Sequence, residues 1–297
     1  MTPREQGFLL LTSHLGDPER KVLTVAQLRT LAFRVQVIPR PEQDRDLLPE
    51  DLVQIGYDRK TAARIFDLLQ GEMQLDRYLK KGKKQECYPL TRISPDYPHR
   101  LRKHLGTDCP GCLWHKGDLS ILNTPGIALV GSRELNADNL VFAQEVGKQA
   151  ALQGYTLISG NARGADRAAQ ESCLSWGGKV ISIVADSLEN QPIRENVLYI
   201  SEDGFDLPFS AQRALSRNRI IHCLGEKVFV AQCRLYKGGT WRGTEQNLLK
   251  NRTPVYCFND GSPATEALVQ MGASAILTDD LTNISALPSA YMNFIDQ

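Results

Sequence analysis

The chain has 297 residues, of which 42% are apolar and 23% are charged, and its formal net charge at pH 7 is +1. This length allows one large domain or two smaller ones with a buried core, and the composition is ordinary for a globular protein. The sequence lacks both the run of about 18 apolar residues that a membrane span needs and a signal peptide, so we expect a cytoplasmic protein with no membrane contact.

Residues 1–80 are predicted to form a small helical domain. Thr24 is a candidate N-cap, and apolar residues follow it at helical spacing. Further on, two short helices are expected around Gly56, with Asp58 capping the second. Similar helix pairs occur in helix-hairpin-helix units that bind the DNA backbone, but a packing or interaction domain is the simpler interpretation.

Residues 81–126 are predicted to be a linker and lead-in segment. The stretch Leu79–Glu86, LKKGKKQE, is basic, polar and interrupted by glycine, which is typical of a solvated linker. Cys109 and Cys112 then form a C-P-G-C sequence, with Cys87 and His115 nearby. Because no second ligand pair has the usual spacing, we expect a turn with incidental thiols and no metal. The chain's odd total of seven cysteines favours a reducing compartment.

From residue 127 onward, short apolar runs alternate with helical stretches up to residue 297. The runs are rich in β-branched residues and read GIALVG, YTLISG, KVISIVA, KVFVAQC, PVYCF and SAILT. This alternation predicts an α/β domain with a doubly wound, mostly parallel sheet. Such sheets bind ligands at the carboxyl ends of their strands.

Three of these strand ends carry glycine, a hydroxyl and a nearby cation. They are Gly131-Ser132-Arg133, the segment from Ser159 and Gly160 through Arg163 to Asp166, and the segment from Lys237, Gly238, Gly239 and Thr240 to Glu245. Glycine lets backbone amides approach a ligand, helix N-termini carry partial positive charge, and arginine binds phosphate in a bidentate manner. The edge is therefore predicted to bind a phosphate-rich ligand.

The nucleotide motifs that would imply a cofactor are missing. The first strand is followed by V-G-S-R-E-L rather than G-x-G-x-x-G, and the chain contains no G-x-x-x-x-G-K-[ST]. We therefore expect neither a dinucleotide cofactor nor P-loop ATP hydrolysis.

Positive charge is concentrated between Phe209 and Arg252. This segment has nine Arg and Lys residues against two Glu, a net charge of +7 in a chain of +1. It contains Arg217, Asn218 and Arg219, and residues two apart on a helix point in different directions. One arginine is expected to face the ligand edge while the other pairs with a carboxylate such as Asp166.

Two aromatic residues in the basic segment have alternative roles. Trp241 either stacks on a base or caps the core, and for Tyr236 packing is the favoured interpretation.

Together these motifs resemble the DprA/Smf family of DNA-processing proteins. The resemblance extends from about Tyr88 to Asp280 and is carried by ISPDYPHRL, LWHKGDLSIL, ALVGSR, ISGNARGAD, SRNRII and GGTW. It implies a Rossmann-like α/β domain preceded by a small helical domain. Gln170 stands where family members often have histidine, which indicates a divergent member.

The resemblance also implies a function and a set of site residues. It implies a non-catalytic protein that binds single-stranded DNA, forms a homodimer and assists a RecA-type recombinase during DNA uptake or processing. Residues expected to contact the strand or its phosphates are Gly131, Ser132, Arg133, Ser159, Gly160, Arg163, Lys237, Gly238, Gly239 and Thr240. Asp166, Arg217, Asn218 and Arg219 are expected to organise the pocket, the last three also contacting phosphate.

Two other functions fit part of the same pattern. The stretch GGTWRGTE loosely resembles the P-G-G-x-G-T-x-x-E loop of cytokinin-activating phosphoribohydrolases, in which Glu and Arg assist cleavage of a nucleoside monophosphate; Glu245 would then be the acidic residue. A sensor that binds a small nucleotide without turnover would use the same loops. The breadth of the basic segment favours DNA over a single nucleotide.

Overall fold

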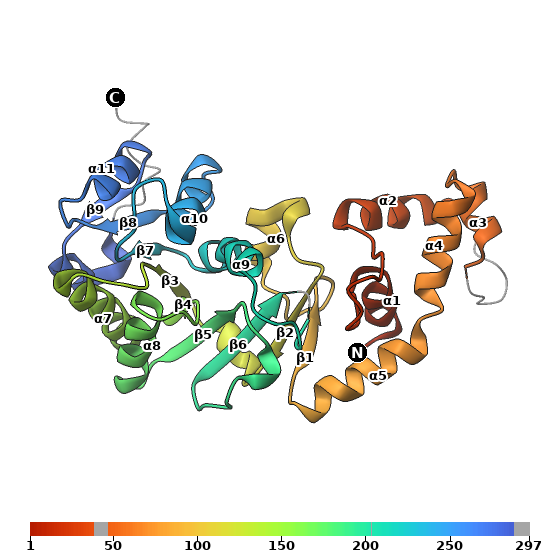
Figure 1. Cartoon of the computed structure of the whole chain (residues 1–297), viewed down its shortest axis with the longest axis horizontal. Helices are drawn as coiled ribbons and strands as arrows, with labels where there is room; N and C mark the ends of the chain where they lie inside the picture. The colour runs from red at the N-terminus through yellow and green to blue at the C-terminus, as the bar shows by residue number, and fades with distance from the viewer. Residues whose placement is uncertain (39–46, 203, 288–297) are drawn as a thin grey trace.

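The computed structural model describes residues 1–38, 47–202 and 204–287 (Figure 1). Residues 288–297, the end of the predicted α/β domain, lie outside the described residues. Among the residues described, no helix has the length and apolar character that crossing a membrane requires.

A mixed sheet forms the centre of the molecule and confirms the predicted fold class. In the described residues its strands are β1 (Tyr88–Thr91), β2 (Cys112–Lys116), β3 (Gly126–Val130), β4 (Thr156–Ser159), β5 (Lys179–Val184), β6 (Val197–Glu202), β7 (Val228–Val230), β8 (Val255–Phe258) and β9 (Ser274–Ile276). Their order is β1-β2-β6-β5-β4-β3-β7-β8-β9. Pairs from β6 to β9 are parallel, whereas β1 and β2 are antiparallel additions. The strand order reverses between β3 and β7, which is the topological switch point.

Helices cover both faces of this sheet (Figure 1). One face packs against α7 (Ala137–Leu152), α8 (Ala165–Ser175) and the 3-10 segment η4 (Thr278–Ala286). The other packs against α6 (His99–Leu105), α9 (Ala211–Leu224), α10 (Gly238–Leu249) and α11 (Pro263–Gln270). Short 3-10 turns are η1 (Gly106–Asp108), η2 (Leu119–Asn123) and η3 (Leu188–Asn190).

The central strand β3 shows why the sheet is covered on both sides. Ile127 and Leu129 belong to the core on the α7 and α8 face, whereas Ala128 and Val130 belong to the core on the α9 face. All four are buried. A strand that is apolar at every position needs a helix layer on each face, as the apolar runs of the sequence predicted.

Five helices of the described chain precede the sheet. They are α1 (Pro3–Thr12), α2 (Val25–Val35), α3 (Pro49–Gln54), α4 (Arg59–Leu69) and α5 (Glu72–Lys84). Helices α1 to α4 share a core that includes Leu31, Leu52 and Ile65, whereas Leu75 and Tyr78 of α5 belong to the core of the sheet. The predicted N-caps are confirmed, because the side chains of Thr24 and Asp58 accept hydrogen bonds from the backbone of α2 and α4.

The segment expected to be a linker is structured. Residues 79–84 complete α5, and residues 88–91 and 112–116 are strands of the main sheet. The helix persists because its buried side packs on the sheet: a Cβ on Gly82 would lie 3.1 Å from the Trp114 ring, and the Tyr78 hydroxyl donates to Asp206 at 2.7 Å. The division of the chain into domains at residues 80 and 126 stays a prediction.

Candidate functional site

The switch point between β3 and β7 opens into a cavity of about 610 Å³. The loop after β3 forms one wall, α9 forms another, and the first turn of α10 closes a third. Most of the predicted site segments meet here. The lining residues are Val130, Gly131, Ser132, Arg133, Glu134, Ala162, Asp166, Phe209, Ala211, Ala214, Leu215, Arg217, Asn218, Ile221, Arg234, Lys237, Gly238, Gly239, Thr240 and Arg242.

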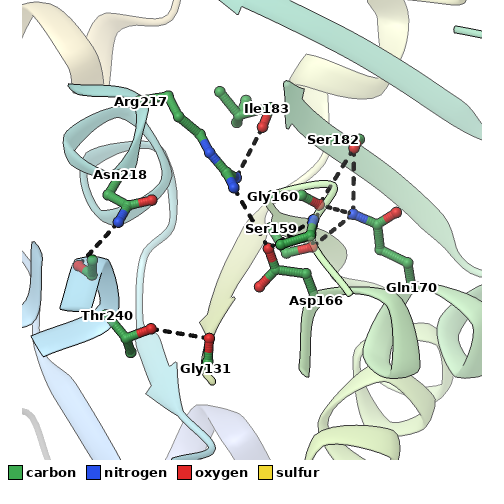
Figure 2. Close-up of polar contacts among 12 residues, drawn as sticks. Gly131, Ser159, Gly160, Asp166, Gln170, Ser182, Ile183, Arg217, Asn218 and Thr240 are labelled. Atoms are coloured by element: carbon green, nitrogen blue, oxygen red, sulfur yellow. Dashed lines mark hydrogen bonds and ion pairs between the residues drawn. The ribbon is translucent and has the colours of Figure 1, made fainter. Parts of the chain in front are cut away.

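The first turn of α10 lies at this cavity. The helix begins at Gly238, so the residues predicted to form a loop lie in its first turn. Gly238 itself has a φ of +85°, a backbone conformation that glycine adopts easily. Thr240 Oγ1 donates to the Gly131 carbonyl at 2.9 Å, and Asn218 Nδ2 donates to the Gly239 carbonyl at 3.0 Å (Figure 2). The cap residue Lys237 makes no side-chain bond to the helix. The N-terminus of α10 is therefore held in place without a side-chain cap, which leaves amide donors and a partial positive charge for an anion.

The loop after β3 is packed too tightly for larger residues. A Cβ on Gly131 would lie 2.4 Å from the Cβ of Ala165, at the start of α8. The backbone N–H of Ser132 donates to the Gln232 carbonyl at 2.9 Å, and its hydroxyl donates to the same oxygen at 3.2 Å. Glycine here permits close helix packing, and the serine ties the loop after β3 to the chain after β7.

Arg217 is a buried member of this site. It is 8% exposed, donates through Nη1 to the Ile183 carbonyl at 2.9 Å, and places Nη2 3.7 Å from Asp166 Oδ2 (Figure 2). Burial raises the pKa of Asp166 and lowers the pKa of Arg217, and in each case the charge of the partner opposes the shift. A Cβ on Gly160 would stand 1.6 Å from Arg217 Nη1, so glycine at this position makes room for the guanidinium.

Ser159 and Gly160 do not reach the cavity, contrary to the prediction that they contact phosphate. Ser159 is fully buried, and Gln170 Nε2 donates to its hydroxyl at 2.7 Å. Gln170 also donates to the Gly160 carbonyl, and the Ser182 hydroxyl lies beside the same group (Figure 2). The β4–α8 loop thus uses its hydroxyl and glycine to build the wall beneath the site.

Arg219 also lies outside the cavity. Its guanidinium pairs with Glu202 and donates to the Asp108 carbonyl. The sequence correctly predicted that Arg217 and Arg219 diverge and that one pairs with Asp166. The expectation that the other faces the ligand edge was wrong, because a second carboxylate holds it.

Three cations on the cavity rim have side chains that are available to a ligand. Arg133, Lys237 and Arg242 line the cavity and are exposed, and their side chains make no hydrogen bond or ion pair with any residue that the structure describes. Arg163 is also exposed and unpaired within the described chain, but it lies outside the lining. Arg234 lines the cavity and pairs with Glu134 at 2.9 Å, with both side chains largely in solvent.

The aromatic residues take roles that the sequence did not fix. Trp241 is 2% exposed and donates through Nε1 to Glu245 at 3.3 Å, so it belongs to the core. Tyr236, expected to pack, is 70% exposed and meets Trp241 only edge-on. Sequence reasoning missed Phe209, which lines the cavity while 56% exposed. The sequence feature that could have identified Phe209 is its position immediately before Ser210, the N-cap of α9.

The chemistry available in the described residues does not include a metal centre. No group of three or more His, Cys, Asp or Glu residues within ranges 1–38, 47–202 and 204–287 could hold a metal ion. Cys109 and Cys112 are buried, and Cys109 Sγ lies 3.2 Å from the Tyr97 hydroxyl. The site offers cations, amide donors and an exposed aromatic ring, which together suit a ligand with phosphates and bases.

The chain matches a family model described as DNA recombination-mediator protein A over residues 89–286. It is 29% identical over 258 residues to the DNA processing protein DprA of Streptococcus pneumoniae, which covers 78% of this chain and 85% of that protein. It is 30% identical over 183 residues to protein Smf of Escherichia coli, which covers 56% of this chain and 48% of that protein.

Solved structures show the same fold. The X-ray structure of DprA from S. pneumoniae superposes with a TM-score of 0.69 at 24% identity, covering 95% of this chain and 97% of that one. DprA from Helicobacter pylori, whose structure is described as showing its single-stranded DNA binding mode, superposes with a TM-score of 0.56 at 22% identity. That match covers 67% of this chain and 94% of the other.

Proposed function

Because this chain belongs to the DprA/Smf family of DNA recombination-mediator proteins, we propose that its cavity binds single-stranded DNA without catalysing a reaction on it. The observation that carries the proposal is the rim of Arg133, Lys237 and Arg242, which are exposed and unpaired within the described chain beside the N-terminus of α10. Cations without carboxylate partners are free to neutralise phosphates.

Two features favour a single strand over a duplex. The binding surface is a cavity rather than a ridge, so bases have to leave a helical stack in order to enter it. Phe209 offers an exposed ring at the same cavity, and base stacking on aromatic rings contributes about 1–3 kcal/mol per base. The H. pylori relative, described as having a single-stranded DNA binding mode, supports the same ligand class.

The geometry gives little support to the phosphoribohydrolase alternative. That reaction needs an acidic residue at the nucleotide, yet Glu245 lies outside the cavity lining and accepts a hydrogen bond from Trp241. Asp166 lines the cavity, but it is held beside the buried Arg217 guanidinium. We therefore propose a binding protein rather than an enzyme.

Further properties are proposed from the family resemblance alone. We propose that the protein acts in the cytoplasm, forms a homodimer and assists a RecA-type recombinase. A pull-down with purified recombinase, and sedimentation of the free protein, would test these two partners directly.

The test of DNA binding uses Arg133→Ala and Arg242→Ala, with Arg77→Ala as a matched control on the exposed side of α5. Binding to a fluorescent oligothymidylate is measured by anisotropy across a salt series. If three rim cations meet three phosphates, log affinity falls against log salt with a slope of about −2, and each rim variant flattens the slope by about 0.7. Arg77→Ala should change neither value.

Two outcomes would contradict the proposal. One is unchanged affinity and salt slope in both rim variants. The other is release of free base when the protein is incubated with nucleoside monophosphates, which would favour the enzymatic alternative.

A further inference from the structure

A second basic region lies on the helical layer of the same face as α9, at the far end of α10 from the cavity. We define the α6–α10 surface by two exposed lysines, Lys103 of α6 and Lys250 directly after α10. Arg100, which is partly buried, and Arg252, which is 8% exposed, add positive charge beside it. Figure 1 shows α9 lying between the two helices, and the contacts of Asp108 join them.

The charge of this surface is only partly compensated. Asp108 lies 3.6 Å from Lys250 Nζ and 4.0 Å from Arg252 Nη2, and its own side chain is 60% exposed. Lys103 is exposed and makes no hydrogen bond or ion pair with any residue in the described ranges. Arg100 donates to the Gly225 carbonyl, which satisfies one donor but leaves its charge uncancelled at that contact. Asp108 is thus shared by Lys250 and Arg252, and Glu226 acts on Arg100, so that two carboxylates face four cations in this region.

The cations of this region also surround His104, a neighbouring residue on α6. Burial lowers the pKa of His104 first, and Arg100, Lys103, Arg252 and His99 each lower it further. None of the causes of that shift is a carboxylate that raises it. A neutral ring surrounded by cations is the result expected where positive charge exceeds negative charge.

The exposed side of α10 connects this surface to the cavity. Arg242, Gln246 and Lys250 follow one another at four-residue spacing, and all three are exposed. Arg242 lines the cavity, whereas Lys250 lies beside Asp108. At 1.5 Å per residue, the eight-residue interval spans about 12 Å along the helix. The two basic regions therefore lie along one continuous path.

We propose that the α6–α10 surface is a second contact site for the phosphate backbone of the strand held in the cavity. The inference rests on the proposed function, because it extends the path of the same ligand along α10. The defining side chains of this surface are cations, so it contacts phosphates and does not select bases. The strand bound by one protein chain is then longer than the cavity alone could hold.

The experiment compares oligonucleotides of two lengths. Anisotropy titrations use an oligothymidylate of about 5 nucleotides, within the cavity's reach, and one of about 20, since site sizes of single-strand binders run from about 4 to 16 per module. The variant is Lys103→Ala/Lys250→Ala, in which both substituted side chains are exposed. Lys179→Ala, an exposed lysine at the start of β5, is the matched control.

We expect the double variant to bind the short oligonucleotide as the parent does and to bind the long one about tenfold more weakly. Two lost phosphate contacts should also flatten the salt slope by about 1.4, for the long oligonucleotide only. Lys103→Arg/Lys250→Arg should restore both values, and Lys179→Ala should change neither.

The outcomes separate this inference from the proposed function. Equal binding of the long oligonucleotide by the parent and the double variant overturns the inference, as does a loss that is the same for both lengths. Failure of both Arg133→Ala and Arg242→Ala to weaken binding of the short oligonucleotide overturns the proposed function instead.

Discussion

The interior of the site and its rim use the same kinds of residue in different ways. In the interior, Gly160 makes room for the guanidinium of Arg217, which lies against Ile183 and Asp166. Ser159 is held beside it by a hydrogen bond from Gln170. On the rim, the side chains of Arg133, Lys237 and Arg242 make no hydrogen bond or ion pair with the described residues. A glycine, a hydroxyl and a cation at a strand end can therefore build a wall or bind a ligand, and the position of the nearest carboxylate distinguishes the two.

Burial explains why the interior cation cannot serve the ligand. Taking a guanidinium out of water costs several kcal/mol unless a counter-charge and hydrogen bonds replace the water. Arg217 has both, and its 8% exposure leaves little surface for a phosphate. The rim cations remain hydrated and unpaired within the described ranges, so they can exchange water for phosphate at small cost.

The largest expected effect is on the free energy of unfolding, which a substitution in the interior should lower far more than one on the rim. Arg217→Ala leaves Asp166 buried beside an empty space, and removing one member of a buried pair costs about 3–5 kcal/mol. Urea denaturation followed by circular dichroism measures the change. Arg242→Ala on the rim should stay within about 0.5 kcal/mol of the parent. Equal stability of the two variants would show that the buried pair has no structural role.

A double-mutant cycle tests whether Gly160 acts through the same guanidinium. Gly160→Ala places a methyl group where Arg217 Nη1 lies, so it also displaces the guanidinium from Asp166. The combined variant should then cost about 1–3 kcal/mol less than the sum of the single changes. Additive costs would mean that Gly160 is needed for another reason.

The sequence predicted the sheet and the location of the site because both depend on local patterns. The apolar runs identified β3 and its neighbours β4 and β7, and Thr24 and Asp58 identified two helix starts. The sequence analysis did not predict strand β6, although residues 197–200 form an apolar run. It did not predict β1 either, because Pro89 argues against a strand, although an edge strand tolerates proline.

The division between wall and rim could not be predicted from local sequence. It depends on pairs distant in the chain, such as Arg217 with Asp166 and Arg219 with Glu202. Tyr236 and Trp241 were ambiguous for the same reason, because exposure is decided by packing partners rather than by residue type. Patterns of spacing identify which residues reach an edge, but not which of them are already paired there.

Phe209 gives the next largest effect and sharpens the description of the rim. Phe209→Ala should weaken single-stranded DNA binding by about 1–3 kcal/mol, because it removes a stacking surface. The salt slope should stay unchanged, since no charge is lost. Anisotropy titrations against normal and abasic oligonucleotides measure the difference, and Phe33→Ala on α2, with Phe33 73% exposed, is the control. An equal loss on abasic DNA would exclude stacking.

Acid should affect the interior through His222, which lies buried on α9. Burial lowers its pKa to about 3, with Arg252 contributing, whereas an unfolded histidine titrates near 6.5. Above pH 6.5 the ring is neutral in both states. Below that pH the histidine binds a proton in the unfolded chain but not in the folded chain. The free energy of unfolding therefore falls by about 1.4 kcal/mol at pH 5.5.

His222→Leu isolates this contribution. The ring nitrogens of His222 have no hydrogen-bond partner among the described residues, so the apolar substitution removes no hydrogen bond. Urea denaturation at pH 7.5 and 5.5 should show a smaller loss on acidification in the variant than in the parent. The same loss in both proteins would place the acid sensitivity elsewhere.

The smallest expected effect has the opposite sign. Glu134 lines the cavity and holds Arg234 in a pair whose side chains are 84% and 71% exposed, so the pair itself contributes only about 0–1 kcal/mol. Glu134→Ala should leave stability unchanged, remove the rim's negative charge and free a fourth cation for the strand. Affinity for single-stranded DNA should rise a few-fold at low salt, and the salt slope should steepen by about 0.7. Arg234→Ala is the matched variant and should not steepen the slope. A fall in affinity for Glu134→Ala would mean that the pair positions the rim, so that the rim, like the wall, depends on its carboxylates.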